Sequence, residues 1–149
     1  MNHDYEVILA ASKKSYEILS EEGGALNDYK LVKTDFTALE CLTELKAQIY
    51  SKFGKLDLLI NNAEIANGFG QKIEQITIDE VKQVYETNLF AVIRIIQLFK
   101  PLLEKSDDPS IINITSALGD IDKMKDEDFC YANYCMTAYA TSKAALNMF

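Results

Sequence analysis

The chain has 149 residues, of which 48% are hydrophobic and 26% are charged, and its formal net charge is −8. This composition supplies enough apolar side chains for one globular core and is too rich in them for a disordered chain. The excess of acidic residues would repel a phosphate backbone, which excludes nucleic acid as an expected partner. The longest apolar stretch, residues 89–99, contains Arg94 and Gln97 and is too short to span a bilayer, so no membrane association is expected.

Histidine and cysteine leave little material for metal or disulfide chemistry. The single histidine, His3, stands near the chain start, and Cys41, Cys130 and Cys135 form no C-x-x-C pair. No metal site and no Ser/His/Asp triad is therefore expected. The N-terminus has no apolar run typical of a signal peptide, and with the cysteine pattern this predicts a cytoplasmic protein.

Apolar periodicity predicts strands and helices that alternate along the chain. Residues 38–53 have apolar side chains at helical spacing, and Gly54 follows where a C-terminal glycine cap is expected. A capping box at Thr77 should begin a further helix, with a break or kink near Asn88 and another before Pro101. The expected strands are residues 5–11, 30–36, 56–60 and 111–115, and the expected helices are residues 13–21, 38–53, 77–105 and 136–149.

This alternation is typical of an α/β fold with a doubly wound parallel sheet. The sequence shows no internal repeat, low-complexity tract or interdomain linker. Open sheets of this kind bind ligands beyond the carboxyl ends of their strands, which draws attention to the polar residues after residues 56–60 and 111–115.

Four short strings contain side chains that could carry chemistry. Singly, each has an ordinary structural explanation: Ser116 and Asn61-Asn62 as turn formers, and Asn88 as a helix break with a satisfied amide. The strings are L-D-L-L-I-N-N-A at residues 56–63, V-Y-E-T-N-L-F at 84–90, I-I-N-I-T-S-A-L-G at 111–119 and Y-A-T-S-K-A-A-L at 139–146.

The spacing Y-x-x-x-K occurs twice. Tyr29 and Lys33 belong to an expected strand, where four residues separate two side chains by about 13 Å. Tyr139 and Lys143 belong to an expected helix, where positions i and i+4 share one face at about 6 Å. Only the second pair is close enough to couple electrostatically. Such coupling is needed for acid–base chemistry, because a phenol ionises near neutral pH only with a neighbouring cation.

In their order and separation the four strings resemble the second half of the motif set of the short-chain dehydrogenases/reductases, and most closely the carbonyl-reductase-like subgroup. The resemblance extends over nearly the whole chain, from about residue 5 to residue 149. It implies a partial Rossmann-like, doubly wound parallel sheet whose strands match the second to fifth of the family fold. It also implies an oxidoreductase that interconverts a small carbonyl and an alcohol with NAD(P)H.

The resemblance assigns catalytic roles to four residues. Tyr139 would exchange a proton with the substrate oxygen, while Lys143 would stabilise the phenolate, and both would contact the nicotinamide ribose region. Ser116 would hydrogen-bond the substrate carbonyl, and Asn88 would hold a water that links Lys143 to solvent. The cofactor itself carries the hydride.

The resemblance also implies cofactor contacts in the first half of the chain. Asp35 matches the family's aspartate beside the adenine ring, and Asn61, Asn62 and Ala63 match the N-N-A-G string along the adenosine half. Ser12 stands where the family selects the ribose 2′ group. An acid at the position of Ser12 would favour NAD, whereas Ser12 followed by Lys13 and Lys14 suits a 2′-phosphate, so NADP is preferred and NAD is the alternative. Two lysines that open a helix also suit a solvated face.

The chain departs from the family pattern in three places. Glu64 replaces the glycine of N-N-A-G, and a carboxylate there would hinder close approach and repel phosphates. Ser116 and Tyr139 lie further apart than is usual, and residues 120–134 are interpreted as a substrate-side loop. The glycine-rich T-G-x-x-x-G-x-G turn is absent, and so are the first strand, the first helix and the last strands of the family fold.

These departures predict that residues 1–149 form a single, incomplete NAD(P)-binding domain, truncated at both ends, with little or no turnover in isolation. Two functions fit the sequence: an NAD(P)H-dependent oxidoreductase, or a non-enzymatic truncated Rossmann-like module that binds a partner subunit. The resemblance also implies that the long helix from Asn88 and the catalytic helix form the interfaces of a homo-oligomer. Apolar residues on nearly all sides of residues 89–99 are consistent with this and equally with burial within the chain.

Overall fold

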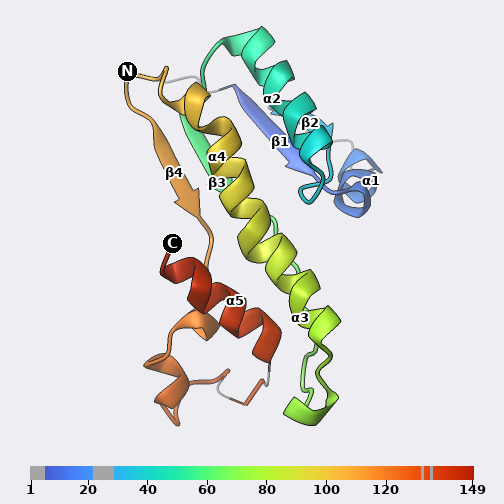
Figure 1. Ribbon diagram of the computed structural model, residues 1–149, viewed down its shortest axis with the longest axis vertical. Coiled ribbons are helices and arrows are strands. Elements are labelled where there is room, and N and C mark those ends of the chain that lie inside the picture. Colours follow the sequence, from blue (N-terminus) through green and yellow to red (C-terminus); the bar gives the residue numbers. More distant parts are fainter. Residues whose placement is uncertain (1–5, 22–28, 132, 135) are drawn as a thin grey trace. The chain divides into compact units, whose positions relative to one another are not determined.

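A computed structural model describes residues 6–21, 29–131, 133–134 and 136–149 (Figure 1). The expected strand start at Tyr5, together with His3 and Cys135, lies outside the described residues. The chain divides into two compact units, Met1–Gly54 and Lys55–Phe149. In the described part of the chain no helix combines the length and apolar character needed to cross a bilayer.

The first unit is a parallel strand pair with two helices. Its elements are β1 (Val7–Ala11), α1 (Lys13–Glu21), β2 (Tyr29–Lys33) and α2 (Leu39–Phe53). The two strands run parallel in a register that pairs Val7 with Tyr29 and Ala11 with Lys33. Strand β2 ends before the expected residue 36 because Asp35 Oδ1 accepts two hydrogen bonds from Thr37, from the backbone N–H at 2.8 Å and the hydroxyl at 2.7 Å, which turns the chain.

Helix α2 confirms the predicted amphipathic pattern and its glycine cap. Leu42, Leu45 and Ile49 are buried, while Leu39 at the first helical position is 55% exposed. Gly54 adopts φ 72° and its N–H donates to the Tyr50 carbonyl at 2.9 Å. This left-handed conformation favours glycine. Gly54 therefore caps the C-terminus of α2, as the sequence predicts.

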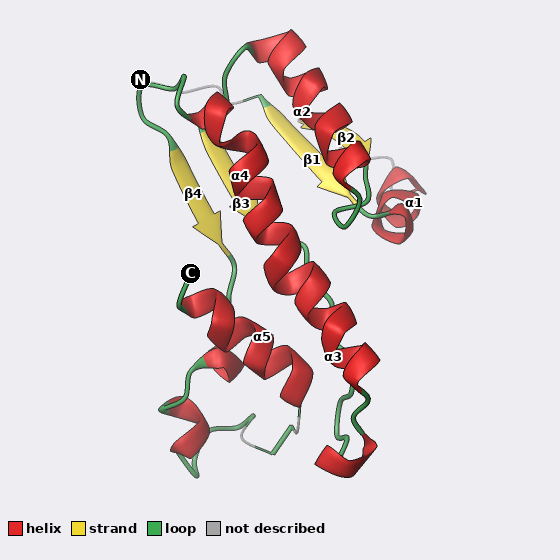
Figure 2. Cartoon of the chain, in the orientation of Figure 1, coloured by secondary structure: helices red, strands yellow, loops and turns green. Residues whose placement is uncertain are grey.

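The described residues of the second unit contain the other strand pair and three α-helices, besides short 3₁₀ and π-helical turns. Its elements are β3 (Leu58–Asn61), α3 (Ile78–Tyr85), α4 (Ala91–Leu103), β4 (Ser110–Asn113) and α5 (Thr137–Asn147). Strands β3 and β4 are parallel, with Leu58 opposite Ser110 and Asn61 opposite Asn113 (Figure 2). Within the described residues, neither β1 nor β3 has a strand partner on its other edge.

The helix after the predicted capping box confirms that motif. The Thr77 hydroxyl accepts from the Glu80 N–H at 3.2 Å, and a Glu80 carboxylate oxygen accepts from the Thr77 N–H at 2.9 Å. This reciprocal pair satisfies backbone donors that would otherwise be free at the helix start. The predicted irregularity near Asn88 is a π-helical turn, Glu86–Phe90, that connects α3 to α4.

Of the break or kink predicted before Pro101, the break is wrong, because α4 continues through this proline to Leu103, while the kink stays a prediction. Proline lacks the N–H that would bond to the carbonyl of Gln97 four residues earlier. Gln97 is exposed, so water can satisfy that carbonyl, and only the last residues of the helix follow the proline. The position near the helix end explains why Pro101 is tolerated.

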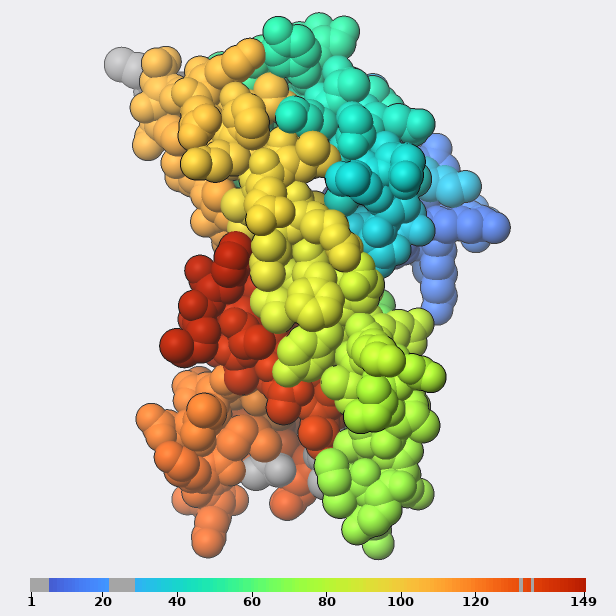
Figure 3. All heavy atoms as spheres, viewed as in Figure 1, coloured from blue at the N-terminus to red at the C-terminus, as the bar shows by residue number. Residues whose placement is uncertain are grey.

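Helix α5 packs directly against α3 and the π-helical turn (Figure 3). Its buried side chains recur at helical spacing and therefore form one face. Three of them carry polar groups, which is unusual for a buried face. The buried residues are Ala138, Tyr139, Ser142, Lys143 and Leu146.

We expect Thr77→Ala to lower the free energy of unfolding by about 1 kcal/mol, because the substitution removes the N-cap oxygen of α3. Urea denaturation measures the difference. Thr141→Ala is the matched control, since the exposed Thr141 hydroxyl bonds only to carbonyls of its own helix, Thr137 and Ala138. Equal stability of the two variants would contradict the capping role.

Candidate active site

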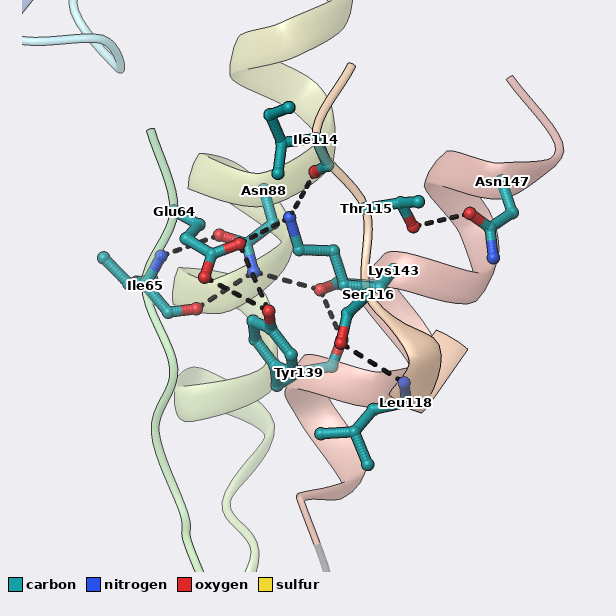
Figure 4. A network of polar contacts seen from close by, with 11 residues as sticks. Glu64, Ile65, Asn88, Ile114, Thr115, Ser116, Leu118, Tyr139, Lys143 and Asn147 are labelled. Carbon is teal, nitrogen blue, oxygen red and sulfur yellow. Dashed lines mark hydrogen bonds and ion pairs between the residues drawn. The ribbon is translucent and has the colours of Figure 1, made fainter. Parts of the chain in front are cut away.

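Side chains from four segments of the second unit meet beyond the carboxyl ends of β3 and β4 (Figure 4). The first two segments are the stretch after β3 and the π-helical turn between α3 and α4. The other two are the stretch after β4 and one face of α5. This is where an open α/β sheet is expected to bind a ligand. The residues are Glu64, Ile65, Asn88, Ile114, Ser116, Tyr139, Ser142 and Lys143.

Asn88 holds two of these segments together. Its side chain is buried, with 1% of the residue exposed. Its Oδ1 accepts from the Ile65 N–H at 2.9 Å, and its Nδ2 donates to the Ile65 carbonyl at 2.9 Å and to Ser142 Oγ at 3.1 Å. Both amide donors are thus engaged, which leaves one lone pair on Oδ1 for any water. The hydrogen bonds of the Asn88 amide are thus satisfied within the protein, which agrees with the interpretation of Asn88 as a helix break with a satisfied amide.

The structure brings Tyr139 and Lys143 to one buried face of α5, as their spacing predicts. Lys143 Nζ lies 5.7 Å from the centre of the Tyr139 ring and donates to the Ile114 carbonyl at 2.7 Å. The competing pair, Tyr29 and Lys33, occupies the two ends of β2. Helical spacing therefore separates the pair that can couple from the pair that cannot.

Glu64 also belongs to this site, which the sequence analysis did not anticipate. Its Oε2 lies 2.6 Å from Lys143 Nζ, and the Tyr139 hydroxyl donates to its carboxylate, with distances of 3.1 Å and 3.2 Å to the two oxygens. The Glu64 side chain is 39% exposed, whereas that of Lys143 is 3% exposed. The signal for this residue was its place directly after N-N-A, where the family has glycine.

The surroundings raise the pKa of the Tyr139 hydroxyl above its ordinary value. Burial is the largest cause, since it disfavours the charged phenolate. The Ser116 side chain opposes the rise by hydrogen bonding, while the negative charge of Glu64 and its hydrogen bond add to it. The neutral phenol is therefore favoured, and the Lys143 ammonium is paired with Glu64.

Ser116 lies at the start of the short 3₁₀ turn Ala117–Gly119, which packs on α5. Its hydroxyl accepts from the Leu118 N–H at 3.2 Å. A Cβ on Gly119 would lie only 2.7 Å from both the carbonyl carbon of Lys143 and the backbone nitrogen of Ala144. Glycine thus permits the close approach that sets Ser116 beside the helix bearing Tyr139 and Lys143.

The predicted cofactor residues of the second unit lie at or just after the end of β3. Asn61 is buried, and its Nδ2 donates to Asn113 Oδ1 at 2.9 Å, so the two amides pair across the ends of β3 and β4. Asn62 and Ala63 are exposed. Asn61 therefore has a structural partner within the sheet, while the next two residues are accessible to a ligand.

The other two predicted cofactor residues, Ser12 and Asp35, belong to the first unit. Ser12 Oγ accepts from the Ser15 N–H at 3.4 Å at the start of α1. Asp35 stabilises the turn before α2 through Thr37, and these hydrogen bonds hold the pKa of its carboxyl below the ordinary value. Both residues thus have local structural roles, and their cofactor roles stay predictions.

Comparison with known proteins decides the family. A family model described as short chain dehydrogenase matches residues 1–149. The chain belongs to the short-chain dehydrogenase family. The resemblance seen in the sequence is therefore confirmed, and so is the partial Rossmann-like α/β fold with parallel strands.

Relatives of this short-chain dehydrogenase include proteins that are named as dehydrogenases or reductases. The 7alpha-hydroxysteroid dehydrogenase of Escherichia coli (strain K12) is 34% identical over 113 residues, which cover 76% of this chain and 39% of that protein. Short-chain dehydrogenase/reductase 1 of Saponaria officinalis is 29% identical, with 91% of this chain and 62% of that protein covered. The chain thus spans less than two thirds of the length of these relatives.

Among solved structures, the NADPH-bound carbonyl reductase from chicken fatty liver superimposes with a TM-score of 0.81. The match covers 96% of this chain and 59% of that one, at 26% sequence identity. The carbonyl-reductase-like character predicted from the motif strings is thus supported by a structural neighbour.

We expect Asn88→Ala to lower the free energy of unfolding by about 2–4 kcal/mol, because it removes the partner of the part-buried backbone N–H and carbonyl of Ile65 and the hydrogen bond that the buried Ser142 hydroxyl accepts. Chemical denaturation followed by circular dichroism measures the loss. Asn67→Ala is the control, since the Asn67 amide bonds to Gln83 at an exposed position and should cost little. Similar losses in both variants would contradict the anchoring role of Asn88.

Proposed function

We propose that the protein is an NAD(P)H-dependent oxidoreductase that interconverts a carbonyl and an alcohol, with Tyr139 as the acid and base. The observation that carries the proposal is the buried Tyr139–Lys143 pair on α5, next to the turn that begins at Ser116. Reduction of a carbonyl to an alcohol needs a hydroxyl that donates a proton, a cation that stabilises the resulting anion, and a second hydroxyl that donates a hydrogen bond to the carbonyl oxygen. The similarity to a hydroxysteroid dehydrogenase and to a carbonyl reductase supports the same chemistry.

The raised pKa of Tyr139 favours the reduction direction. A neutral phenol can donate its proton to a substrate carbonyl oxygen, whereas alcohol oxidation first needs the phenolate. Ser116 would donate a hydrogen bond to the same oxygen and so stabilise the charge that develops there. After the proton has left, the Lys143 ammonium would stabilise the phenolate from one helical turn away.

The residues present fit the ribose of a nicotinamide cofactor. A lysine ammonium has three N–H donors, and Lys143 uses two of them, for Ile114 and for Glu64. The third donor can bind one ribose hydroxyl, and the donor that serves Glu64 could bind a second. The exposed Asn62 and Ala63 lie in the adjoining stretch after β3. When bound, the nicotinamide supplies the hydride.

We propose NADP as the cofactor and NAD as the alternative. Lys13 and Lys14 at the start of α1 are exposed and positively charged, which suits a 2′-phosphate. The proposed substrate is a small carbonyl compound or alcohol, and the proposed compartment is the cytoplasm. A second copy of the chain is the proposed macromolecular partner.

A non-enzymatic module that binds a partner subunit is the second candidate function. The observation that favours it is the Glu64 carboxylate, which engages both Tyr139 and Lys143. The same contact supports the expectation of low turnover by the 149-residue chain, since the one hydroxyl proton of Tyr139 is directed to Glu64.

Steady-state NADPH oxidation with a panel of aldehydes, ketones and quinones tests the enzymatic proposal. We expect slow turnover that falls by about 100-fold or more in Tyr139→Phe, because the phenyl ring has no proton to exchange. Tyr29→Phe is the matched control, since this tyrosine has the same sequence spacing to a lysine but lies on β2. An unchanged rate in Tyr139→Phe would contradict the proposal.

Thermal unfolding separates the two candidate functions. For an NADP-dependent enzyme, we expect NADPH to raise the melting temperature of the chain more than NADH does, since a ligand that binds only the folded state stabilises it. A cooperative melt that neither nucleotide shifts, together with no turnover, would favour the non-enzymatic module.

A further inference from the structure

Glu64 occupies the donors that the proposed chemistry needs. The Tyr139 hydroxyl has a single proton, and it points to the Glu64 carboxylate. Lys143 directs one of its N–H groups to the same carboxylate at 2.6 Å. While Glu64 holds this position, Tyr139 has no proton available for a substrate oxygen.

Hydrogen bonds fix the backbone next to Glu64, whereas the Glu64 side chain is partly exposed. Asn88 binds both the N–H and the carbonyl of the adjacent Ile65, so the start of the Glu64 side chain has a defined place. The carboxylate itself is partly exposed, and its contacts in the described residues are the ion pair and the hydrogen bond to Tyr139. Charge therefore holds it at the site, and water is available to solvate it elsewhere.

We propose that Glu64 is a positioning residue that acts as an internal ligand of Tyr139 and Lys143. Substrate and cofactor oxygens must displace the Glu64 carboxylate in order to bind. This inference rests on the proposed function, because it concerns the same two side chains. In the resting state the carboxylate fills the place of those oxygens and satisfies the buried ammonium. In the working state it turns to solvent, and Tyr139 and Lys143 regain their donors.

The groups around Glu64 allow this exchange without a loss of hydrogen bonds. The charged or titratable groups that contact it are the Lys143 ammonium and the Tyr139 phenol, while the nearby Asn88 amide is neutral. A ligand oxygen can accept from the same two donors, so the number of hydrogen bonds is maintained. The exchange involves no bond cleavage and needs no co-reactant.

The first test follows the titration of Tyr139 without any ligand. The chain is labelled with ¹³Cζ-tyrosine, and the Tyr139 resonance is assigned by its loss in Tyr139→Phe. We expect Glu64→Gln to move this titration to lower pH, because it removes the negative charge beside the phenol and leaves Lys143 as its charged neighbour. Glu74→Gln, which removes the same charge from an exposed position, should leave it unchanged.

Glu64→Asp guards against a folding defect in Glu64→Gln. This variant keeps the negative charge but shortens the side chain by one methylene, so its carboxylate should not reach both partners. We expect its Tyr139 titration to differ from that of the parent chain. An unchanged titration in every folded Glu64 variant would overturn the proposal.

The second test measures NADPH binding by fluorescence titration. We expect Glu64→Gln to bind NADPH several-fold more tightly than the parent chain, and Glu74→Gln to match the parent. Equal or weaker binding by Glu64→Gln would overturn the internal-ligand role and assign Glu64 a purely structural one. If no chain binds NADPH, the proposed cofactor use fails, and the Tyr139 titration alone decides whether Glu64 controls this side chain.

Discussion

The buried amide of Asn88 is the contact on which the site depends. It joins Ile65, which follows β3, to Ser142 on α5, and it lies in the π-helical turn between two helices. A buried polar group without partners is costly, so its hydrogen bonds specify one arrangement of these segments. Glu64 and Lys143 are the sequence neighbours of the two anchored residues, and the anchor therefore brings the carboxylate and the ammonium together.

Glu64 links the buried Lys143 ammonium to the Tyr139 hydroxyl. A buried ammonium requires close acceptors, and here the Ile114 carbonyl and the Glu64 carboxylate provide them. Burial raises the pKa of the Tyr139 hydroxyl most, the Ser116 hydrogen bond opposes this rise, and the charge and hydrogen bond of Glu64 add to it. The family resemblance implies a lysine that stabilises a phenolate, and displacement of Glu64 would allow Lys143 to do so.

The same local geometry has a steric component. Gly119 lets a turn of the chain approach the backbone of α5 at Lys143 more closely than any side chain would permit. Asn147 near the end of α5 donates to the Gly119 carbonyl at 3.2 Å and thereby ties this turn to the helix. Tyr139 and Lys143 thus project from a helix that is fixed at several points, as a site with defined geometry requires.

The sequence by itself determined the features that depend on neighbours within a turn or two of chain. Thr77 and Glu80 specify a helix start, Gly54 specifies a helix end, and the spacing of Tyr139 and Lys143 puts both on one helix face. The motif strings were specific enough to predict the family, which the comparison confirms. The prediction of a single incomplete domain over residues 1–149 is not tested by the structure.

Tertiary structure decided the features that join distant segments. Glu64 and Tyr139 are 75 positions apart in sequence, and Asn88 reaches partners 23 and 54 positions away. The sequence marked Glu64 only as a departure from a glycine, because nothing near it in the chain shows which side chains it will contact. Local patterns reflect hydrogen bonds and packing within one element. The ion pair of Glu64 instead depends on Asn88, which binds Ile65 after β3, and on the packing of the π-helical turn against α5.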